Sequence, residues 1–231
     1  LHKNFHLPEI NKAEIQLLNI FSQLTCLGAS KKLALSFTKM EDDNDHRICI
    51  VPPLLRKEVF SMQATTGNYI HGYMVNAGFA ENVMAWHQRC PETELRFFWD
   101  RKGEKEVKVI DETLSFHPLD DKAFLKQMSG CKAYASTAGF ESVCEAMYLG
   151  KPILMVPAHI EQDCNAQDAA RSGAGIVSDD FDLDRLLRFA GQYKPNPSFR
   201  TWVNSAPYVI LHALEPEPHD LPYLSGQVRM A

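Results

Sequence analysis

A run of small and hydroxylated residues, Ser136-Thr137-Ala138-Gly139-Phe140, connects a short apolar strand to a helix. Backbone N–H groups at the start of a helix have no partner within the helix, and the helix dipole places partial positive charge there. Such a turn can bind phosphate without a Lys or Arg side chain. Glu145 follows about one and a half turns into the same helix, within reach of a ribose attached to that phosphate.

A second turn of the same kind follows the next apolar segment, residues 153–156. It opens a helix with Glu161-Gln162-Asp163-Cys164-Asn165, and a spacing of three places Gln162 and Asn165 on one helical face. Ordinary N-capping by Glu161 or Asp163 would explain the same pattern without a ligand. A lone Ala-Gly turn is a weak signal, but two consecutive polar turns make a nucleotide-sugar site plausible.

The elements that position these turns alternate between strands and helices from residue 48 onward. Alternation of this kind predicts an α/β fold, a doubly wound parallel sheet with helices on both faces. We expect strands at 47–51, 69–75, 95–99, 107–110, 114–116, 133–135, 153–156 and 175–177, and helices at 80–89, 121–128, 182–189 and 199–214, besides the two that follow the polar turns.

Residues 1–47 form a separate unit in this interpretation. Residues 13–27 have the apolar spacing of an amphipathic helix, residues 32–38 resemble a strand, and residues 41–45 are a charged connector. One helix and one strand cannot enclose a core, so we expect a remnant of a second domain. The predicted division is 1–47, then 48–214 as the nucleotide-sugar-binding domain, then a tail at 215–231.

Composition excludes several functional classes. The chain of 231 residues has 45% hydrophobic residues and a net charge of −5, which argues against a nucleic-acid partner. No apolar run reaches the length of a membrane span and no signal-peptide pattern is present; the first residue, Leu1, suggests a truncated or processed chain. The six cysteines are scattered, which predicts reduced thiols in the cytoplasm and no zinc site.

Three segments, 136–157, 161–166 and 172–176, together resemble the donor-binding domain of GT-B glycosyltransferases. Within that superfamily they are most similar to the peptidoglycan N-acetylglucosaminyltransferase and to the plant and bacterial diacylglycerol sugar transferases. The matching block covers about 40 residues, and the strand order over 48–214 is compatible with it. The motifs are specific for a superfamily and not for a substrate.

The resemblance implies a role for each residue of the block. The amides of Ala138, Gly139 and Phe140 and the hydroxyls of Ser136 and Thr137 would hold the donor diphosphate, and Glu145 would bind the ribose. Members of the family often have His where Thr137 stands. Further contacts would come from residues that read the donor sugar and the base: Glu161, Gln162 and Asn165 for the sugar, Phe116 and His117 for the base. A core position at the end of a strand is the alternative interpretation of Phe116.

The catalytic base is expected in the missing N-terminal acceptor domain, because in this fold it lies across the cleft, so His117 is not assigned that role. The D-x-D strings at 43–45 and 182–184 are interpreted as structural or solvated, and no metal or cofactor is expected. The family implies metal-independent transfer of a hexosyl or N-acetylhexosaminyl group from a nucleoside-diphosphate sugar, most often a UDP-sugar. This chain would be mainly the donor-binding half.

The acceptor is unknown; lipid-linked acceptors are common in the related groups, which leaves peripheral membrane contact open. Two alternatives share the fold. A nucleotide-sugar 2-epimerase usually has an Arg among charged residues after the second strand, and Ala158-His159-Ile160 lacks it. A non-catalytic nucleotide-binding module is the other, kept open by Thr137 and by the absent N-terminal half.

Overall fold

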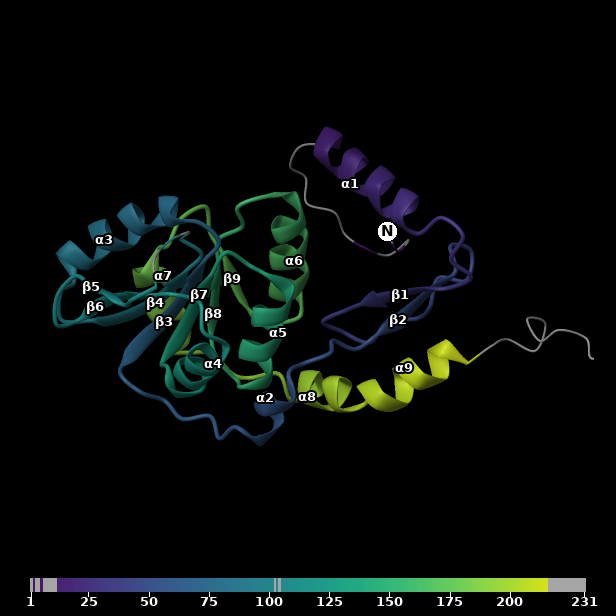
Figure 1. Cartoon of the computed structure of the whole chain (residues 1–231). Coiled ribbons are helices and arrows are strands. Elements are labelled where there is room, and N and C mark those ends of the chain that lie inside the picture. The colour runs from purple at the N-terminus through teal and green to yellow at the C-terminus, as the bar shows by residue number, and fades with distance from the viewer. Residues whose placement is uncertain (1, 3–4, 6–11, 102, 104, 216–231) are drawn as a thin grey trace, which may run out of the picture.

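Two parallel sheets of unequal size organise the chain (Figure 1). The computed structural model describes residues 2, 5, 12–101, 103 and 105–215, so most of the predicted tail lies outside the described residues. The larger sheet has the order β5-β6-β4-β3-β7-β8-β9. Its strands are β3 (Tyr69–Met74), β4 (Glu94–Trp99), β5 (Lys108–Val109), β6 (Leu114–His117), β7 (Ala133–Ser136), β8 (Ile153–Met155) and β9 (Gly175–Val177).

Six strands of the larger sheet run parallel, and helices join all consecutive pairs of them except β4 and β6; these are connected through β5, which pairs with β6 in the antiparallel sense. The predicted α/β doubly wound parallel sheet is therefore confirmed. The connecting helices are α3 (Ala80–Arg89), α4 (Asp121–Gly130), α5 (Phe140–Tyr148) and α6 (Ile160–Arg171), and α7 (Leu183–Ala190) follows the last strand. Most of their bounds lie within two residues of the predicted ones. The short helices α2 (Lys57–Ser61) and η1 (Ala77–Phe79) were not predicted.

The larger sheet has one hydrophobic core on each face, because successive side chains of a strand point to opposite sides. Phe97 packs with Phe116 and Leu154 in one core, and its neighbour Phe98 packs with Tyr134 in the other. Both phenylalanines are fully buried. The face that contains Phe98 is covered by α4 and α5, and the candidate site lies at its edge.

The smaller sheet corrects one prediction. β2 (Ile48–Val51), expected as the first strand of the donor-binding domain, pairs in parallel with β1 (Lys32–Leu35). A boundary at residue 47 would separate these two paired strands, so β2 belongs with the N-terminal unit, beside α1 (Lys12–Thr25) (Figure 1). The connection to the larger sheet then begins at Pro52.

The C-terminal segment is two helices, α8 (Pro197–Asn204) and α9 (Ala206–Leu214), where one helix over 199–214 was expected. The break falls at Ser205, and Pro207 stands in the first turn of α9, where its missing N–H is harmless. Trp202 of α8 packs against Ile48 and Ile50 and donates its Nε1–H to the carbonyl of Ser36 at 2.9 Å. The last helices therefore return to the N-terminal unit, with α9 lying along β2 (Figure 1).

None of the described helices is long and apolar enough to cross a membrane. The six cysteines, all of them among the described residues, form no disulfide with one another, and Cys131, Cys144 and Cys164 are buried.

Candidate active site

The candidate site lies where the strand order of the larger sheet reverses. From β3 the chain proceeds outward to β4 and β6, and then returns to β7 on the other side of β3. Open α/β sheets bind ligands in the crevice at the carboxyl ends of the two strands beside such a switch point. Here the two strand ends are tied together: the Thr137 N–H donates to the Tyr73 carbonyl, and the Val75 N–H donates to Thr137 Oγ1, both at 3.2 Å.

The turn between β7 and α5 has the sharp geometry that the small residues predicted. Ala138 adopts a left-handed conformation with φ of 61°, and Gly139 is the N-cap of α5. The Ala138 N–H donates to Ser136 Oγ at 3.2 Å. The Ser136 hydroxyl therefore accepts a bond within the turn, the Thr137 hydroxyl accepts one from Val75 after β3, and both residues are fully buried. In these positions the two hydroxyls stabilise the turn and its connection to β3. A diphosphate contact from either hydroxyl stays a prediction, and it requires the conformation of the turn to change.

A cavity of about 440 Å³ opens at the start of α5. Because the first-turn amides of a helix lack intrahelical partners, those of Phe140, Glu141 and Ser142 are suited to an anionic group in this cavity. Of the residues predicted to bind the donor diphosphate and ribose, Gly139, Phe140 and Glu145 border this cavity. Glu141 and Ser142 of α5 also line the cavity. The rest of the lining comes from other parts of the chain: Arg56, Tyr73, Leu119, Asp120, Asp121 and Phe124.

Glu145 has a partner that the sequence analysis missed. Arg56 Nε and Nη2 each donate to a carboxylate oxygen of Glu145 at 2.6 Å, and Arg56 Nη1 lies 3.2 Å from Asp121 Oδ1. The Glu145 side chain has no exposed surface. Burial raises its pKa, and the bond to Arg56 acts in the opposite direction. A ribose contact at Glu145 therefore stays a prediction, and it requires Arg56 to move.

The predicted base-binding pair is divided between the two faces of the sheet. Phe116 is 1% exposed and stacks on Trp99, with ring centroids 4.5 Å apart, in the core of the face away from the cavity. It has no surface for a uracil ring, so this part of the prediction is wrong. His117 is half-buried, stacks on Phe98, and lies 2.9 Å from Ser115 Oγ; burial lowers its pKa. Beyond β6, the cavity is bordered by Leu119, Asp120 and Asp121.

The predicted sugar-binding residues are also separated. Gln162 is 7% exposed, and its side-chain oxygen accepts a bond from the Ala158 N–H at 2.9 Å, which makes it part of the turn before α6. Glu161 and Asn165 border a second cavity of about 550 Å³ between α6 and the N-terminal unit. The structure does not bring these two side chains to the first cavity.

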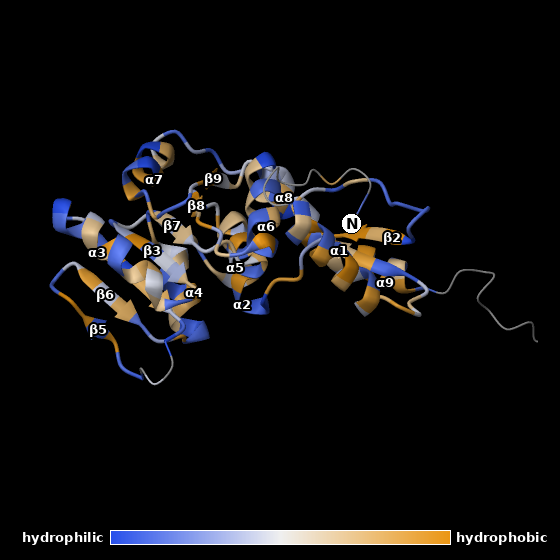
Figure 2. Cartoon of the chain, turned by 90° about the horizontal axis from the view of Figure 1, so that it is seen from above, coloured by the Kyte–Doolittle hydropathy of each residue, from blue (hydrophilic) through white to orange (hydrophobic). Residues whose placement is uncertain are grey.

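The second cavity has an apolar wall. Leu18 and Phe21 of α1 and several residues of β1 and β2 line it, opposite Cys164 of α6. Three apolar side chains of α1 remain largely exposed, Leu17 at 65%, Phe21 at 64% and Leu24 at 60%. Figure 2 shows hydrophobic colouring along α1 and α9 as well as in the strands.

Comparison with known proteins places this arrangement in a family. The family model described as glycosyl transferase family 1 matches residues 3–192, which include both the N-terminal unit and the larger sheet. The chain belongs to that family. A curated relative, the protein named as UDP-glucuronosyltransferase ugt-48 of Caenorhabditis elegans, is 36% identical over 77 residues, which are 32% of this chain and 15% of that protein.

Two solved glycosyltransferases show the same fold. The kitacinnamycin glycosyltransferase has a TM-score of 0.53 and 14% identity over 79% of this chain and 51% of its own. CalG4, the calicheamicin glycosyltransferase, has a TM-score of 0.51 and 16% identity over 86% of this chain and 54% of its own. The chain thus spans about half the length of these solved structures. Its likeness is to glycosyltransferases of family 1 in general, and these matches do not single out the peptidoglycan or diacylglycerol group.

A histidine of the N-terminal unit borders the second cavity. His46 Nδ1 lies 2.9 Å from Asp43 Oδ2; the His46 side chain is 60% exposed and that of Asp43 is fully buried. The Asp43 N–H and carbonyl also bond to Ile48, which fixes the turn before β2. A buried carboxylate that holds one ring nitrogen leaves the other nitrogen available for proton transfer.

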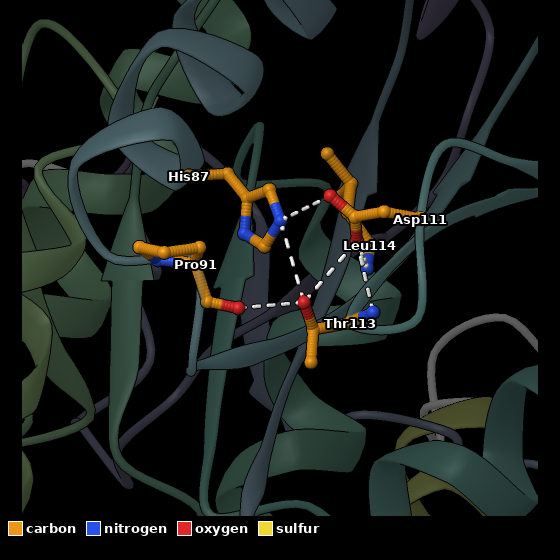
Figure 3. Close-up of polar contacts among 5 residues, drawn as sticks. All are labelled: His87, Pro91, Asp111, Thr113 and Leu114. Atoms are coloured by element: carbon orange, nitrogen blue, oxygen red, sulfur yellow. Dashed lines mark hydrogen bonds and ion pairs between the residues drawn. The ribbon is translucent and has the colours of Figure 1, made fainter.

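A second histidine cluster, His87 with Asp111 and Thr113, has a structural role (Figure 3). Asp111 Oδ2 lies 2.9 Å and Thr113 Oγ1 3.4 Å from the same atom, His87 Nε2. A nucleophile and an orienting carboxylate would occupy opposite ring nitrogens, so this is no catalytic triad. The N–H groups of Thr113 and Leu114 donate to Asp111, and these bonds together with His87 lower the pKa of Asp111 to about 2. The contact between His87 and Asp111 ties the end of α3 to the β5–β6 turn. Among the described residues, no group of three His, Cys, Asp or Glu side chains is arranged to hold a metal ion.

Proposed function

We propose that this chain is the donor-binding part of a glycosyltransferase that takes a nucleoside-diphosphate sugar, with a UDP-sugar as the first candidate. The cavity at the start of α5 carries the proposal, because it combines a topological switch point with free first-turn amides. Membership of glycosyl transferase family 1 supports sugar transfer, and the name of the nematode relative supports UDP as the carrier.

In this proposal the amides of Phe140, Glu141 and Ser142 stabilise the departing diphosphate. Negative charge develops on the nucleoside diphosphate as the bond between its terminal phosphate oxygen and the anomeric carbon of the sugar breaks and the acceptor oxygen bonds to that carbon, and preorganised N–H donors act most strongly on developing charge. The α5 dipole adds to this effect. The donor is a substrate, and we propose that transfer needs no metal or other cofactor. The sugar class that we propose is a hexosyl or N-acetylhexosaminyl group.

We place the acceptor on the side of the second cavity, between α6 and the N-terminal unit. Its wall combines apolar residues of α1 and β1 with the polar side chains of Glu161 and Asn165. This mixture suits an acceptor with an apolar part and a hydroxyl, and a lipid-linked acceptor remains within that class. The finer hypothesis is that the acceptor is one of those used in peptidoglycan or glycolipid synthesis. We propose that the protein is located in the cytoplasm. The finer hypothesis is that it makes peripheral contact with the inner face of a membrane.

His46 is our candidate for the general base. Its imidazole is exposed to the cavity and oriented by Asp43, which is the arrangement that acceptor deprotonation requires. We expect His46→Ala to slow hydrolysis or transfer of the donor sugar by about 100-fold or more without changing nucleotide affinity. Turnover of UDP-sugars by the wild type and the variant measures this. Equal rates in the two proteins would remove His46 from the mechanism.

Two other functions stay as alternatives. A nucleotide-sugar 2-epimerase would release an isomerised sugar without any acceptor, so product analysis separates it from a transferase. A non-catalytic binding module would bind nucleotide without turnover, even when the complete protein is assayed with acceptors. The turn between β7 and α5 is compatible with all three functions, whereas the family match favours the transferase.

A thermal-unfolding panel tests the proposal. The chain is heated with UDP, GDP or dTDP, and with adenosine as a ligand that lacks a diphosphate. A ligand present at 100 times its dissociation constant stabilises the folded state by about 2.7 kcal/mol, which raises the midpoint by several degrees. We expect one nucleoside diphosphate to do so and adenosine to have no effect. No shift with any of the three diphosphates at millimolar concentration would contradict a donor site in this chain.

A further inference from the structure

The cavity at the start of α5 has an uneven charge distribution. Its described lining contains four carboxylates, Asp120, Asp121, Glu141 and Glu145, and one cationic side chain, that of Arg56. A diphosphate is itself strongly anionic, so these carboxylates oppose its entry unless a cation lies nearby. The α5 dipole contributes only a partial charge. Arg56 is the described side chain of this lining that can offset the repulsion directly.

The Arg56 guanidinium is held in place and still has donors to offer. Arginine carries five N–H donors in a planar fork. Two point to Glu145, at 2.6 Å each, and one lies toward Asp121 at 3.2 Å. Two N–H groups therefore remain on the terminal nitrogens, and the side chain is 25% exposed where it borders the cavity. Phe124 packs beside the guanidinium, 6.0 Å from ring centroid to Cζ.

We infer that Arg56 is a donor-phosphate contact of this glycosyltransferase, and that Glu145 and Asp121 are positioning residues that act through it. This inference rests on the proposed function, since it concerns the same cavity. It also explains why Glu145 is fully buried and doubly bonded, a state that suits a support for a guanidinium better than an acceptor of ribose hydroxyls. An arginine fork held on one side by a carboxylate presents its remaining donors in a fixed direction.

The test separates the phosphate from the nucleoside. UDP, or whichever nucleoside diphosphate binds the wild type, is titrated calorimetrically, and the matching nucleoside is followed by ligand-observed NMR, which detects millimolar binding. We expect Arg56→Met to weaken the diphosphate by about tenfold or more and to leave the nucleoside within about twofold of wild type. Arg56→Lys retains the positive charge but loses the planar fork, so its affinity for the diphosphate should lie between those of the wild type and Arg56→Met.

Two further variants protect this test from misfolding and from a general effect of charge. Arg56→Met leaves Glu145 buried without its partner, so the double variant Arg56→Met with Glu145→Met replaces the pair by apolar side chains and should lose the same affinity. Arg96→Met is the matched control, because Arg96 pairs with Glu94 in the amino-terminal half of β4, whereas the cavity lies beyond the carboxyl ends of the strands. It should bind the diphosphate like the wild type.

Glu145→Gln distinguishes the two roles of Glu145. If it positions Arg56, the variant weakens the diphosphate and spares the nucleoside; if it binds ribose, both ligands weaken together. Arg56→Met proteins that bind the diphosphate as tightly as the wild type, or more tightly, would overturn the inference and identify Arg56 as a competitor of the donor. A wild-type chain that binds no nucleoside diphosphate would instead contradict the proposed function.

Discussion

His71, at the centre of β3, is a fully buried histidine surrounded by aromatic rings. Its ring stacks on Tyr134 with centroids 5.3 Å apart and meets Phe98 edge-on. Desolvation by burial lowers its pKa from 6.5 to about 3, and the positive charges of Arg96 and Lys151 act in the same direction. The folded protein therefore holds His71 neutral over a pH range in which the unfolded chain binds a proton.

This difference predicts a loss of stability in mild acid. The unfolded state binds more protons between about pH 6.5 and pH 3, so the contribution of His71 is fully present above pH 6.5 and falls as the pH decreases through that window. Urea unfolding at several pH values measures it. A His71→Leu variant should lose this part of the pH dependence; an unchanged slope between pH 6 and pH 4 would show that other groups cause it.

Residue types alone identified part of the site. Gly139 and Phe140 were predicted from local turn chemistry and do border the cavity, because strand, turn and helix start are consecutive in the sequence. Arg56 could not be found in this way, since it precedes Glu145 by 89 positions and follows no motif. Phe116 and His117 are adjacent, and only the register of β6 decides that Phe116 turns into the core while His117 lies on the other face.

At the level of elements, the contact between β3 and β4 depends on Gly72. A Cβ atom added at Gly72 would lie 2.2 Å from the ring of Phe97, which is fully buried. Gly72→Ala should therefore force the ring or the strand to shift and destabilise the fold by about 1–3 kcal/mol. Chemical denaturation measures the change.

Gly191 supplies the control for that substitution. It ends α7 with φ of −65°, and its nearest neighbour to an added Cβ is at 3.5 Å. Gly191→Ala should be neutral or slightly stabilising, since the alanine restricts the unfolded chain without strain. Equal destabilisation by both substitutions would contradict the packing argument for Gly72.

Periodicity predicted most strands and helices because each long segment has one consistent pattern. It joined α8 and α9, since the apolar spacing continues across Ser205 and the helix start marked by Pro207 was overlooked. It also assigned β2 to the wrong sheet. Which strands pair with one another depends on contacts between segments that are distant in the sequence. The connector between β1 and β2 gives no sequence signal that these two strands pair.

At the level of the whole molecule, Trp202 joins the two units. It is 7% exposed, packs on Ile48 and Ile50, and donates to the Ser36 carbonyl. Trp202→Ala should loosen the N-terminal unit, because large-to-small changes at buried aromatic sites cost about 3–5 kcal/mol. Hydrogen exchange should become at least tenfold faster in β1 and β2 and stay unchanged in β3 and β7.

Tyr208→Ala on α9 is the control for Trp202, because its side chain is 76% exposed. It should leave exchange in β1 and β2 as in the wild type. If Trp202→Ala also accelerates hydrogen exchange uniformly over the larger sheet, the two units unfold together. Trp202 would then stabilise more than the contact between the two units.

The central claim is that the start of α5 binds the diphosphate of a sugar donor. Gly139 allows this to be tested without damaging the fold: its φ is −61°, and an added Cβ would meet only Ser142 Oγ at an ordinary 3.7 Å. Asp is a preferred N-cap residue, so Gly139→Asp should keep or strengthen α5 while placing a negative charge where the diphosphate would bind. Gly139→Asn is the neutral control of the same shape.

Calorimetric titration of UDP into the wild type, Gly139→Asp and Gly139→Asn is therefore the most direct measurement, repeated with GDP and dTDP if UDP does not bind. We predict that a nucleoside diphosphate binds the wild type, that Gly139→Asn weakens it only modestly, and that Gly139→Asp abolishes measurable binding in a protein at least as stable to heat. Undiminished binding by a folded Gly139→Asp protein would contradict the account, because the nucleotide would then occupy a different part of the molecule.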